Sequence, residues 1–546
     1  MSAFLTRVFA HLRAHPSRPF ISEVHGHRLT RAYGGRMLEW IGQARGQLRA
    51  RGIRPGSRVA LLAPNSARWV EADLSVLAEG AVVVPLYARQ APEELAYMVR
   101  HSGAELVVAS DAGLRDGVRG QGVDVPAVVF DELFTGPSLD EAPRDRAPDD
   151  LMTIVYTSGT SGRPKGVMST AGNVDFMVRT IDGKLTELLG TRGGSDRVFH
   201  YLPFVFSGSR FVLWSNLYRA NGLMVSTDIT NLAEELRTAA PEWCLNVPAL
   251  LERLRSGVEE RIGEQPLPVR ALYDGALAAW RRELADQASV TDVLLLAAAR
   301  RWLLGRVRQE LGPNLRCLIC GSAPLAPETQ AWFDLLDLPV YQVYGLTETT
   351  AIVSMDRPDQ ALPGTVGFPL DGVDVRLGEA GELQVRGPNV FGGYWNDPEA
   401  TAAAFTEDGF FRTGDRASID AEGRLAIIGR LKNLLIPESG HNVPPEPLEL
   451  EIATRIDGGE HAVVVGHGRP YLVAVLSGDA DRDAVQRGLD ELNRDLPHYR
   501  RIRAFHLAAA AFTTEGGLLT ANRKVRRGAV ERRYADEIEA LYRSGS

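Results

Sequence analysis

Cysteine is scarce in this chain of 546 residues, which has three: Cys244, Cys317 and Cys320. So small a number cannot build a disulfide scaffold and suits a reducing compartment, so we expect a cytoplasmic protein. Cys317 and Cys320 form a CxxC pair, but the chain has no second pair. Buried apolar cysteines therefore explain this pair better than a zinc site does.

Long basic runs are also absent. Lys and Arg total 61 against 69 Asp and Glu, which gives a formal net charge of −8. Nucleic acid is a polyanion that requires a basic face, so this balance argues against nucleic acid as a partner. The first 20 residues lack the continuous apolar run and the cleavage site of a secretory signal, and we expect no export.

No apolar run is long enough to span a bilayer. The most apolar segment, residues 291–307, carries Arg300 and Arg301 in its middle and is shorter than the roughly 20 residues that a bilayer requires. We therefore expect no transmembrane segment. We interpret residues 291–307 as an amphipathic helix that packs on the core. Capping a ligand tunnel and touching a membrane surface as a peripheral contact are the alternatives.

The composition that remains is that of a large globular protein, with 45% hydrophobic and 24% charged residues. Apolar runs alternate with helix-like stretches over residues 58–109, and again over 197–255, which predicts an α/β fold with mostly parallel sheets. Short strands and turns from residue 372 predict a β-rich subdomain. Residues 432–546 read as a small α+β domain, so we expect a boundary between domains 1–431 and 432–546.

One segment has the physics of a phosphate-binding loop. In TIVYTSGTSGRPKGVM, residues 153–168, an apolar strand leads into small and hydroxyl-bearing residues and then Lys165. Small residues let backbone N–H groups approach an anion, and the lysine adds charge. The common P-loop is excluded because Pro164 precedes Lys165 and Gly166 follows it. For a generic loop of this composition, a flexible glycine turn is the alternative.

The string YTSGTSGRPKGV resembles the signature of the adenylate-forming (ANL) superfamily of AMP-binding enzymes. Further similar strings follow in family order: YGLTETT at 344–350, FRTGD at 411–415, IIGRLKN at 427–433 and LLTANRKVRR at 518–527. The string RGPNVFGGYWNDPEAT and a helical insertion near residues 270–310 look most like the long-chain fatty acyl-CoA synthetases.

This resemblance implies an ATP-dependent acyl-CoA synthetase that uses Mg²⁺, and CoA as cosubstrate. The enzyme would activate a lipophilic carboxylic acid as acyl-AMP, release pyrophosphate and pass the acyl group to the CoA thiol. The acid would bind near the apolar segments 204–211 and 243–250, which could equally be core. One alternative sends the acyl group to an acyl carrier protein in natural-product biosynthesis. Another is a silent homologue that serves as a binding module.

The resemblance also assigns roles to individual residues. Catalysis would use Lys524, Glu348, Thr347 and Lys165, with Glu348 and Thr160 as metal ligands. ATP and AMP would bind Thr157, Ser158, Gly159, Thr160, Ser161, Gly162, Ser322, Ala323, Pro324, Gln342, Val343, Tyr344, Gly345, Leu346, Asp415, Ile427 and Arg430. The Lys524 ammonium would compensate charge between the substrate carboxylate and the α-phosphate.

Motion of the small domain is a further implication. Lys432 would be the hinge about which this domain rotates, replacing Lys524 at the site by a loop with Ser439, Gly440 and His441 on the thiol path. Val205 and Phe206 would line the acyl or thiol channel. Phe206 is a departure, because long-chain enzymes of the superfamily usually have histidine there, so the acceptor and the acyl substrate stay open.

Overall fold

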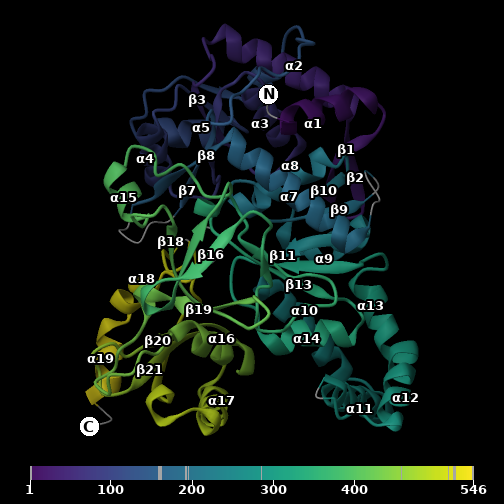
Figure 1. Cartoon of the computed structure of the whole chain (residues 1–546), viewed down its shortest axis with the longest axis vertical. Coiled ribbons are helices and arrows are strands. Elements are labelled where there is room, and N and C mark those ends of the chain that lie inside the picture. Colours follow the sequence, from purple (N-terminus) through teal and green to yellow (C-terminus); the bar gives the residue numbers. More distant parts are fainter. Residues whose placement is uncertain are drawn as a thin grey trace. The chain divides into compact units, whose positions relative to one another are not determined.

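The computed structural model describes residues 3–157, 163–190, 194, 196–284, 286–456, 458–514, 516–520 and 524–543. The chain forms two compact units. The first comprises Met1–Asp374 and Arg386–Phe411, and the second Val375–Val385 and Arg412–Ser546. Figure 1 follows the chain through its elements. The β-rich segment after residue 411 thus groups with the C-terminal residues. The predicted boundary at 431/432 concerns which residues rotate together, and it stays a prediction.

A six-stranded sheet holds the first alternating segment. Its strand order is β6-β5-β3-β4-β7-β8, parallel throughout except for the antiparallel pair β7 and β8. The bounds are β3 Arg58–Leu62, β4 Val82–Leu86, β5 Leu106–Ala109, β6 Ala127–Val129, β7 Leu151–Thr157 and β8 Lys165–Thr170. Helices α3 (Ala67–Ala78), α4 (Pro92–Ser102) and α5 (Ala112–Arg119) connect its parallel strands in sequence. This confirms the predicted α/β alternation over residues 58–109.

A nine-stranded sheet forms the other half of the first unit, in the order β15-β14-β13-β12-β11-β9-β10-β1-β2. The six strands from β13 to β1 are parallel, and β2, β14 and β15 are antiparallel to their neighbours. The bounds are β1 Pro19–His25, β2 Arg28–Tyr33, β9 Arg197–His200, β10 Gly222–Ser226, β11 Trp243–Asn246, β12 Cys317–Cys320, β13 Val340–Tyr344, β14 Ser354–Met355 and β15 Phe368–Pro369.

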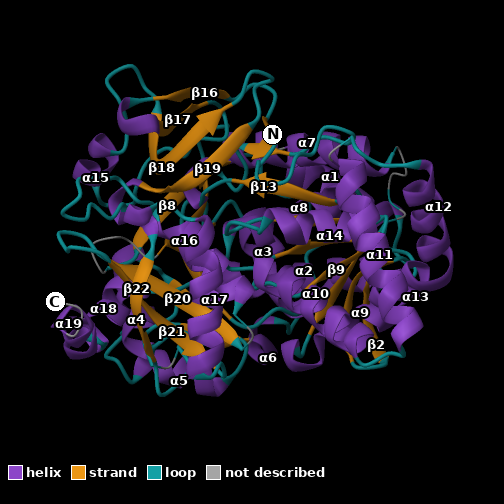
Figure 2. Ribbon diagram, turned by 90° about the horizontal axis from the view of Figure 1, so that it is seen from below, coloured by secondary structure: helices purple, strands orange, loops and turns teal. Residues whose placement is uncertain are grey.

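The remaining helices of the first unit are drawn in purple in Figure 2. They are α1 Ala3–Ala14, α2 Gly34–Ala50, α6 Phe130–Leu133, α7 Ala171–Leu189, α8 Ser207–Tyr218, α9 Leu232–Ala239, α10 Pro248–Gly263, α11 Leu267–Leu284, α12 Val290–Ala299, α13 Gly305–Leu311, α14 Pro327–Leu335 and α15 Pro398–Ala403. A π-helical turn, Arg300–Leu304, joins α12 to α13. The predicted helix over 291–307 is therefore interrupted by a change of helical pitch.

A buried ion pair joins the two sheets. Arg210, on α8 between strands of the nine-stranded sheet, pairs with Asp73 on α3, and their side chains are 1% and 0% exposed. Arg210 also donates to Thr153 Oγ1 on β7 (2.6 Å), and Trp214 Nε1 donates to Asp73 Oδ2 (2.9 Å). Burial raises the pKa of Asp73, while the charge of Arg210 opposes that shift. The pair is tolerable in the core because both Asp73 oxygens and two of the three Arg210 nitrogens have these partners, although Arg210 Nε has none among the described residues.

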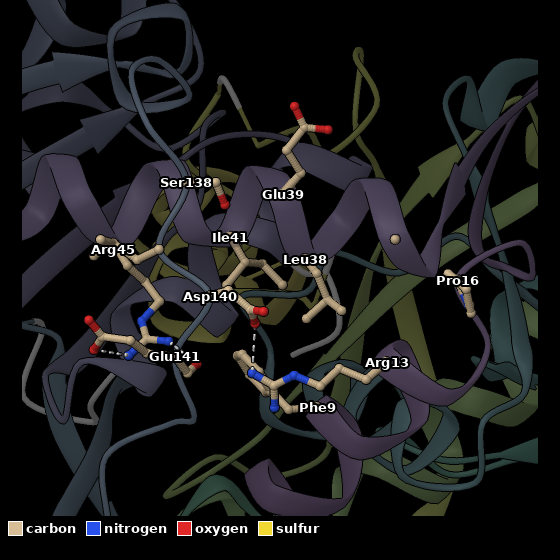
Figure 3. A pocket seen from close by; sticks show the side chains of 12 residues that line it. Phe9, Arg13, Pro16, Leu38, Glu39, Ile41, Arg45, Ser138, Asp140 and Glu141 are labelled. Carbon is tan, nitrogen blue, oxygen red and sulfur yellow. Dashed lines mark hydrogen bonds and ion pairs between the residues drawn. The ribbon is translucent and has the colours of Figure 1, made fainter.

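The polar segment of residues 137–150, between α6 and β7, packs against α2. Arg45 on α2 is buried and donates to Glu79 Oε1 (2.6 Å) and to the carbonyl oxygen of Glu141 (2.6 Å). A Cβ on Gly42 would lie 2.1 Å from Ser138 Oγ, so only glycine allows this approach. A hollow of about 340 Å³ lies between this segment and the N-terminal helices. Figure 3 shows Arg13 directed toward Asp140, and the Arg13 Nη2 and Asp140 Oδ1 atoms are 3.2 Å apart. The loop is thereby fastened to the N-terminal helices.

The second unit contains two further sheets. The four-stranded sheet β16-β17-β18-β19 lies mostly within it, and a three-stranded sheet β20-β21-β22 has one antiparallel and one parallel pair. The strands are β16 Asp374–Leu377, β17 Glu382–Arg386, β18 Phe411–Ile419, β19 Leu425–Arg430, β20 Gly459–Val465, β21 Leu472–Gly478 and β22 Ile502–Leu507. The helices are α16 Pro445–Arg455, α17 Arg482–Asp495, α18 Arg527–Arg533 and α19 Ala535–Arg543. The predicted β-rich subdomain and α+β end are both confirmed.

Among the described helices, none has the length and apolarity that crossing a membrane requires.

We expect Arg210→Met to lower the free energy of unfolding by about 3–5 kcal/mol, because Asp73 would stay buried without its counter-charge. The double variant Arg210→Met/Asp73→Asn should lose less than the single variant, since no uncompensated charge remains. Denaturation in urea measures both. The control is Arg261→Met, whose exposed ion pair with Glu310 spans 3.7 Å and should contribute less than about 1 kcal/mol. Equal losses in the single and double variants would contradict the argument.

Candidate functional site

The carboxyl ends of β12 and β13 lie side by side, and both lead into predicted nucleotide-binding residues. After β12 the chain turns through Ser322, Ala323 and Pro324, which are all exposed, and Ser322 has a φ of +75°. A Cβ on the preceding Gly321 would lie 2.6 Å from Val343 Cγ2 on β13, so the turn passes close to this strand. Exposed turns at the carboxyl end of a parallel sheet are the usual place for a ligand.

The turn after β13 holds Thr347 and Glu348 half-exposed. A Cβ on Gly345 would lie 2.0 Å from the carbonyl oxygen of Ala351, so the chain folds back on itself only because position 345 is glycine. Leu346 N–H donates to Thr349 Oγ1 (2.9 Å), which closes a 3-10 turn over Thr347–Thr349. Thr350 Oγ1 then donates to the carbonyl oxygen of Asn389 (2.6 Å) and anchors the turn.

Gln342 differs from its neighbours because its side chain points into the interior. The residue is 5% exposed, its Nε2 donates to Gln330 Oε1 (2.7 Å), and its backbone N–H donates to Asp356 Oδ2 (2.7 Å). Burial raises the pKa of Asp356 to about 7. Asp356 and Gln330 thus hold Gln342 of β13 in place through hydrogen bonds. Sequence patterns did not single out either residue. A role of Gln342 in binding AMP stays a prediction.

The predicted phosphate-binding loop connects β7 to β8. Thr157, half-buried, pairs with Lys165 across this antiparallel hairpin. Ser158, Gly159, Thr160, Ser161 and Gly162, including the predicted metal ligand Thr160, lie outside the described residues.

Lys165 and Glu348 come together on the side chain of Tyr394. The Lys165 Nζ lies 4.9 Å from the centre of the Tyr394 ring, and the Tyr394 hydroxyl donates to Glu348 Oε1 at 3.0 Å. Within the described chain, no residue donates to the other carboxylate oxygen, Oε2. A carboxylate oxygen beside a hairpin predicted to bind phosphate suits Mg²⁺, which is commonly held by one or two carboxylates together with substrate phosphates.

Tyr394 is placed by residues 391–396, which run between the two motifs. Phe391 N–H donates to the Glu348 carbonyl oxygen (2.8 Å), and Trp395 N–H donates to the Gly166 carbonyl oxygen (2.7 Å). The segment therefore ties the hairpin to the turn that carries Glu348. The sequence contained a signal for it, since it belongs to the string RGPNVFGGYWNDPEAT, but the string itself assigns no role to Tyr394.

Of the two predicted channel residues, Phe206 is half-buried and Val205 is buried. The Phe206 ring precedes α8 and lies 5.9 Å from the ring of Tyr87, which follows β4. The neighbouring Phe204 is fully buried and stacks on His200 at 5.2 Å. Burial lowers the pKa of His200 to about 4, so this imidazole is neutral at physiological pH. Phe204 and Trp243 are thus core residues, and Phe206 with Tyr87 is the pair with exposed surface.

The second unit brings together Asp415, Arg430 and Lys524. Asp415 on β18 faces Arg430 on β19, and Arg430 Nε lies 2.7 Å from Asp415 Oδ1. Lys524 retains exposed surface. Its pKa is nevertheless lowered, because its ammonium group loses hydration and lies near the like charge of Arg430. The charge of Asp415 opposes this shift in part. The backbone N–H of Lys524 donates to Thr520 Oγ1 (3.0 Å), which fixes the position of Lys524 relative to Thr520. Ile427, also predicted, is half-buried on the same strand as Arg430.

The predicted hinge follows directly after Arg430. Lys432 lies in a 3-10 turn, Leu431–Asn433, and is exposed. Loss of hydration and the charge of Arg430 lower its pKa, whereas Asp415 and Glu446 raise it.

The loop with Ser439, Gly440 and His441 is a hairpin closed by the bridge between Leu435 and Val443. Gly440 has a φ of +73°, and the His441 ring stacks on Tyr499 at 4.0 Å. A cavity of about 510 Å³ adjoins the loop. It is lined by Pro437, Ser439, Pro470, Tyr471, Leu472, His498, Tyr499, Arg501, Arg503, Ala504 and Leu541. Its two arginines suit an anionic ligand.

The three cysteines are free and buried, and burial raises the pKa of each thiol. In the described part of the chain, no group of three or more His, Cys, Asp or Glu side chains could hold a metal ion. Of the two predicted magnesium ligands, Glu348 and Thr160, only Glu348 lies among the described residues.

Comparison with known proteins places these motifs in a family. The pattern described as AMP-binding enzyme matches residues 8–395, and that of the AMP-binding enzyme C-terminal domain matches residues 432–546. A long-chain-fatty-acid–CoA ligase of Mycobacterium bovis, FadD15, is 29% identical over 540 residues, covering 90% of this chain and 89% of the relative. A putative fatty-acid–CoA ligase of Mycobacterium tuberculosis, fadD11, is 32% identical over 434 residues, or 73% and 74% of the two chains.

Among solved structures, ATP-bound MatB of Rhodopseudomonas palustris is similar at a TM-score of 0.75. The two chains are 26% identical, and the match covers 97% of this chain and 99% of that one.

We expect Tyr394→Phe to weaken binding of magnesium–ATP by about three- to tenfold, because Glu348 would lose a hydrogen bond from a neutral donor to a charged acceptor. Titration calorimetry at fixed magnesium measures the change. Tyr33→Phe is the control, since Tyr33 is exposed at the end of β2 and should leave binding unchanged. Unchanged affinity in Tyr394→Phe would show that this hydrogen bond does not position Glu348.

Proposed function

Because this chain belongs to the family of AMP-binding enzymes, we propose that it is an ATP-dependent acyl-CoA synthetase acting on a lipophilic carboxylic acid. The observation that carries the proposal is the assembly of Lys165, Tyr394 and Glu348 in the first unit. It provides a cation and a carboxylate at the hairpin where nucleotide phosphates are expected. The two relatives, whose names describe fatty-acid–CoA ligases, support CoA as the acceptor.

The reaction has two transfers. A carboxylate oxygen of the acid attacks the α-phosphorus of ATP, and the bond from that phosphorus to the bridging oxygen of pyrophosphate breaks. The CoA thiolate sulfur then attacks the acyl carbonyl carbon, and AMP leaves. The first step moves negative charge from the carboxylate to pyrophosphate, and the second moves it from the thiolate sulfur to AMP, so fixed cations and hydrogen-bond donors supply most of the catalysis.

The first unit would hold the triphosphate. Thr157 and Lys165 flank the hairpin loop and would contact the β- and γ-phosphates, and Thr347 would donate to the α-phosphate. Glu348 Oε2 is available to a magnesium ion, which neutralises phosphate charge when bound. Tyr344 and the exposed Ser322–Pro324 turn offer an aromatic face and backbone groups for adenine.

The second unit would complete adenylation. Asp415 would accept hydrogen bonds from the ribose hydroxyls, and Arg430 orients its carboxylate through their 2.7 Å contact. Lys524 would bridge the acid and the α-phosphate. Rotation about Lys432 would then exchange Lys524 for the hairpin with Ser439 and His441. The adjoining cavity with Arg501 and Arg503 would suit the phosphates of CoA.

Two other functions have less support. A carrier protein as acceptor is less well supported, because the two relatives named above are described as ligases of CoA. A silent homologue would have no reason to retain Glu348, Asp415, Arg430 and Lys524 together. The three buried free thiols support a reducing compartment such as the cytoplasm.

The test is a panel of fatty, aryl and polycyclic acids with ATP and magnesium. We expect pyrophosphate release with a lipophilic acid, followed by transfer to CoA and weaker or no transfer to a holo carrier protein. Pyrophosphate release and thioester formation are measured separately. Transfer to the carrier protein alone would replace CoA as the acceptor. Absence of pyrophosphate with every acid would overturn the enzyme proposal.

We expect Lys524→Ala to slow acyl-adenylate formation by at least about 100-fold, because it removes the cation that compensates developing charge. Thioester formation from supplied acyl-adenylate should stay within about threefold, since Lys524 would have left the site by then. The control, Arg532→Ala, removes an exposed cation of the same unit and should leave both half-reactions unchanged. Equal loss of both half-reactions in Lys524→Ala would contradict the role.

The lowered pKa of Lys524 adds a pH signature to this prediction. The ammonium loses its charge at a lower pH than an ordinary lysine, so adenylation should fall earlier at alkaline pH. Lys524→Arg, whose cation does not titrate there, should lose this alkaline fall in whatever activity it keeps.

A further inference from the structure

Large apolar side chains are exposed mainly in one part of the first unit. The described chain exposes eleven such residues, and six of them lie on α11, α12 and the π-helical turn: Leu267, Leu284, Val290, Val293, Leu294 and Trp302. In Figures 1 and 2, α11, α12 and α13 lie at the margin of this unit, outside the strands. Single exposed apolar residues are ordinary, but a cluster of them marks an interaction surface.

The cluster follows one face of α12. Val290, Val293 and Leu294 are 77%, 52% and 65% exposed and have the i, i+3, i+4 spacing of one helix face. The exposed Ala297 and Ala298 continue this face one turn later. The opposite face, with Leu296 and Ala299, is buried in the core. We call the outer face, from Val290 to Trp302, the α12 stripe.

Positive charge is concentrated at the C-terminal end of the α12 stripe. Arg300, Arg301 and Arg306 are exposed, and within the described chain none of them forms an ion pair. The Arg301 guanidinium lies 5.7 Å from the ring centre of Trp302, which is 63% exposed. Arg282, by contrast, is paired with Asp292 on the inner side. The stripe thus combines apolar side chains, an exposed tryptophan and uncompensated cations.

We propose that the α12 stripe docks on the surface of an anionic phospholipid membrane. Valine, leucine and tryptophan side chains would enter the boundary between headgroups and acyl chains, and the arginines would contact lipid phosphates. Tryptophan and arginine suit this boundary because each joins an apolar body to a polar end. A second copy of the chain is disfavoured as the occupant, because both copies would bring the same uncompensated positive charge to the contact.

This inference goes beyond the proposed function and does not depend on it. A lipophilic acid partitions into membranes, so docking would place the protein beside such a substrate. Binding to lipid can nevertheless be measured without ATP, acid or CoA. Failure of the membrane proposal therefore leaves the proposed reaction untouched, and the reverse also holds.

The experiment is co-sedimentation of the full chain with vesicles of phosphatidylcholine, with or without phosphatidylglycerol. We expect binding to the anionic vesicles, weak binding to the neutral ones, and a decrease with rising salt. Emission of Trp302, taken as the difference between wild type and Trp302→Phe, should shift to shorter wavelength on anionic vesicles. Absence of binding to anionic vesicles would overturn the proposal.

Variants locate the contact. Leu294→Glu should weaken partitioning onto anionic vesicles by about tenfold or more, because it replaces a buried apolar contact by a charge of the lipid's own sign. Arg300→Gln/Arg301→Gln should weaken it by a similar factor. Both changes are at exposed positions, and the melting temperature verifies that the fold is kept.

The matched control is Ile229→Glu, which places the same charge at another exposed aliphatic residue, 47% exposed, of the same unit. It should bind vesicles like wild type. Equal loss in this control would attribute binding to net charge and overturn the assignment to the α12 stripe. Light scattering provides the remaining outcome: a dimer in wild type that Leu294→Glu converts to monomer would identify the stripe as a subunit interface instead.

Discussion

The ion pair between Arg210 and Asp73 is the constraint on which the first unit depends. Arg210 lies on a helix of the nine-stranded sheet, whereas Asp73 and Thr153 belong to the six-stranded half. A buried charge is tolerated only while its partners hold their positions, so α3, α8 and β7 must pack together or not at all. Strand β7 leads directly into the hairpin predicted to bind phosphate, and Phe206 directly precedes α8. The charge in the core thus positions the edges where the ligands are expected.

Each unit holds its own charged side chains in place. Glu348 is held by Tyr394 in the first unit, and Asp415 by Arg430 in the second. Each of these two contacts lies within one unit, so motion of one unit relative to the other need not break either of them. Because Asp415 and Arg430 neutralise one another, Lys524 supplies the net positive charge among these three residues. This arrangement suits a lysine that acts in one step and is absent in the next.

Much of the fold was predictable, because strand and helix periodicities alternate cleanly over residues 58–109, and family motifs mark the hairpin, the Glu348 turn and Lys524. The position of Tyr394 was not predictable, because no spacing in the sequence reveals that this residue lies between Lys165 and Glu348. Residues 291–307 pack on the core with one face, as expected of an amphipathic helix, but the sequence did not show that the other face would also expose large apolar side chains. Leucines occur on both faces of α12, and only the position of α11 decides which of them are covered.

The four-stranded sheet has a consequence for how the chain is made. Strands β16 and β17 precede the last segment of the first unit, residues 386–411, yet β17 pairs with β18, which follows that segment. During synthesis the ribosome therefore releases the first strands of the second unit before the first unit is complete. Until β18 emerges, β17 has an unpaired edge, so the second unit cannot be obtained whole by a single cut of the chain. The boundary between the units therefore exists only in the folded molecule, because no single position in the sequence separates the two units.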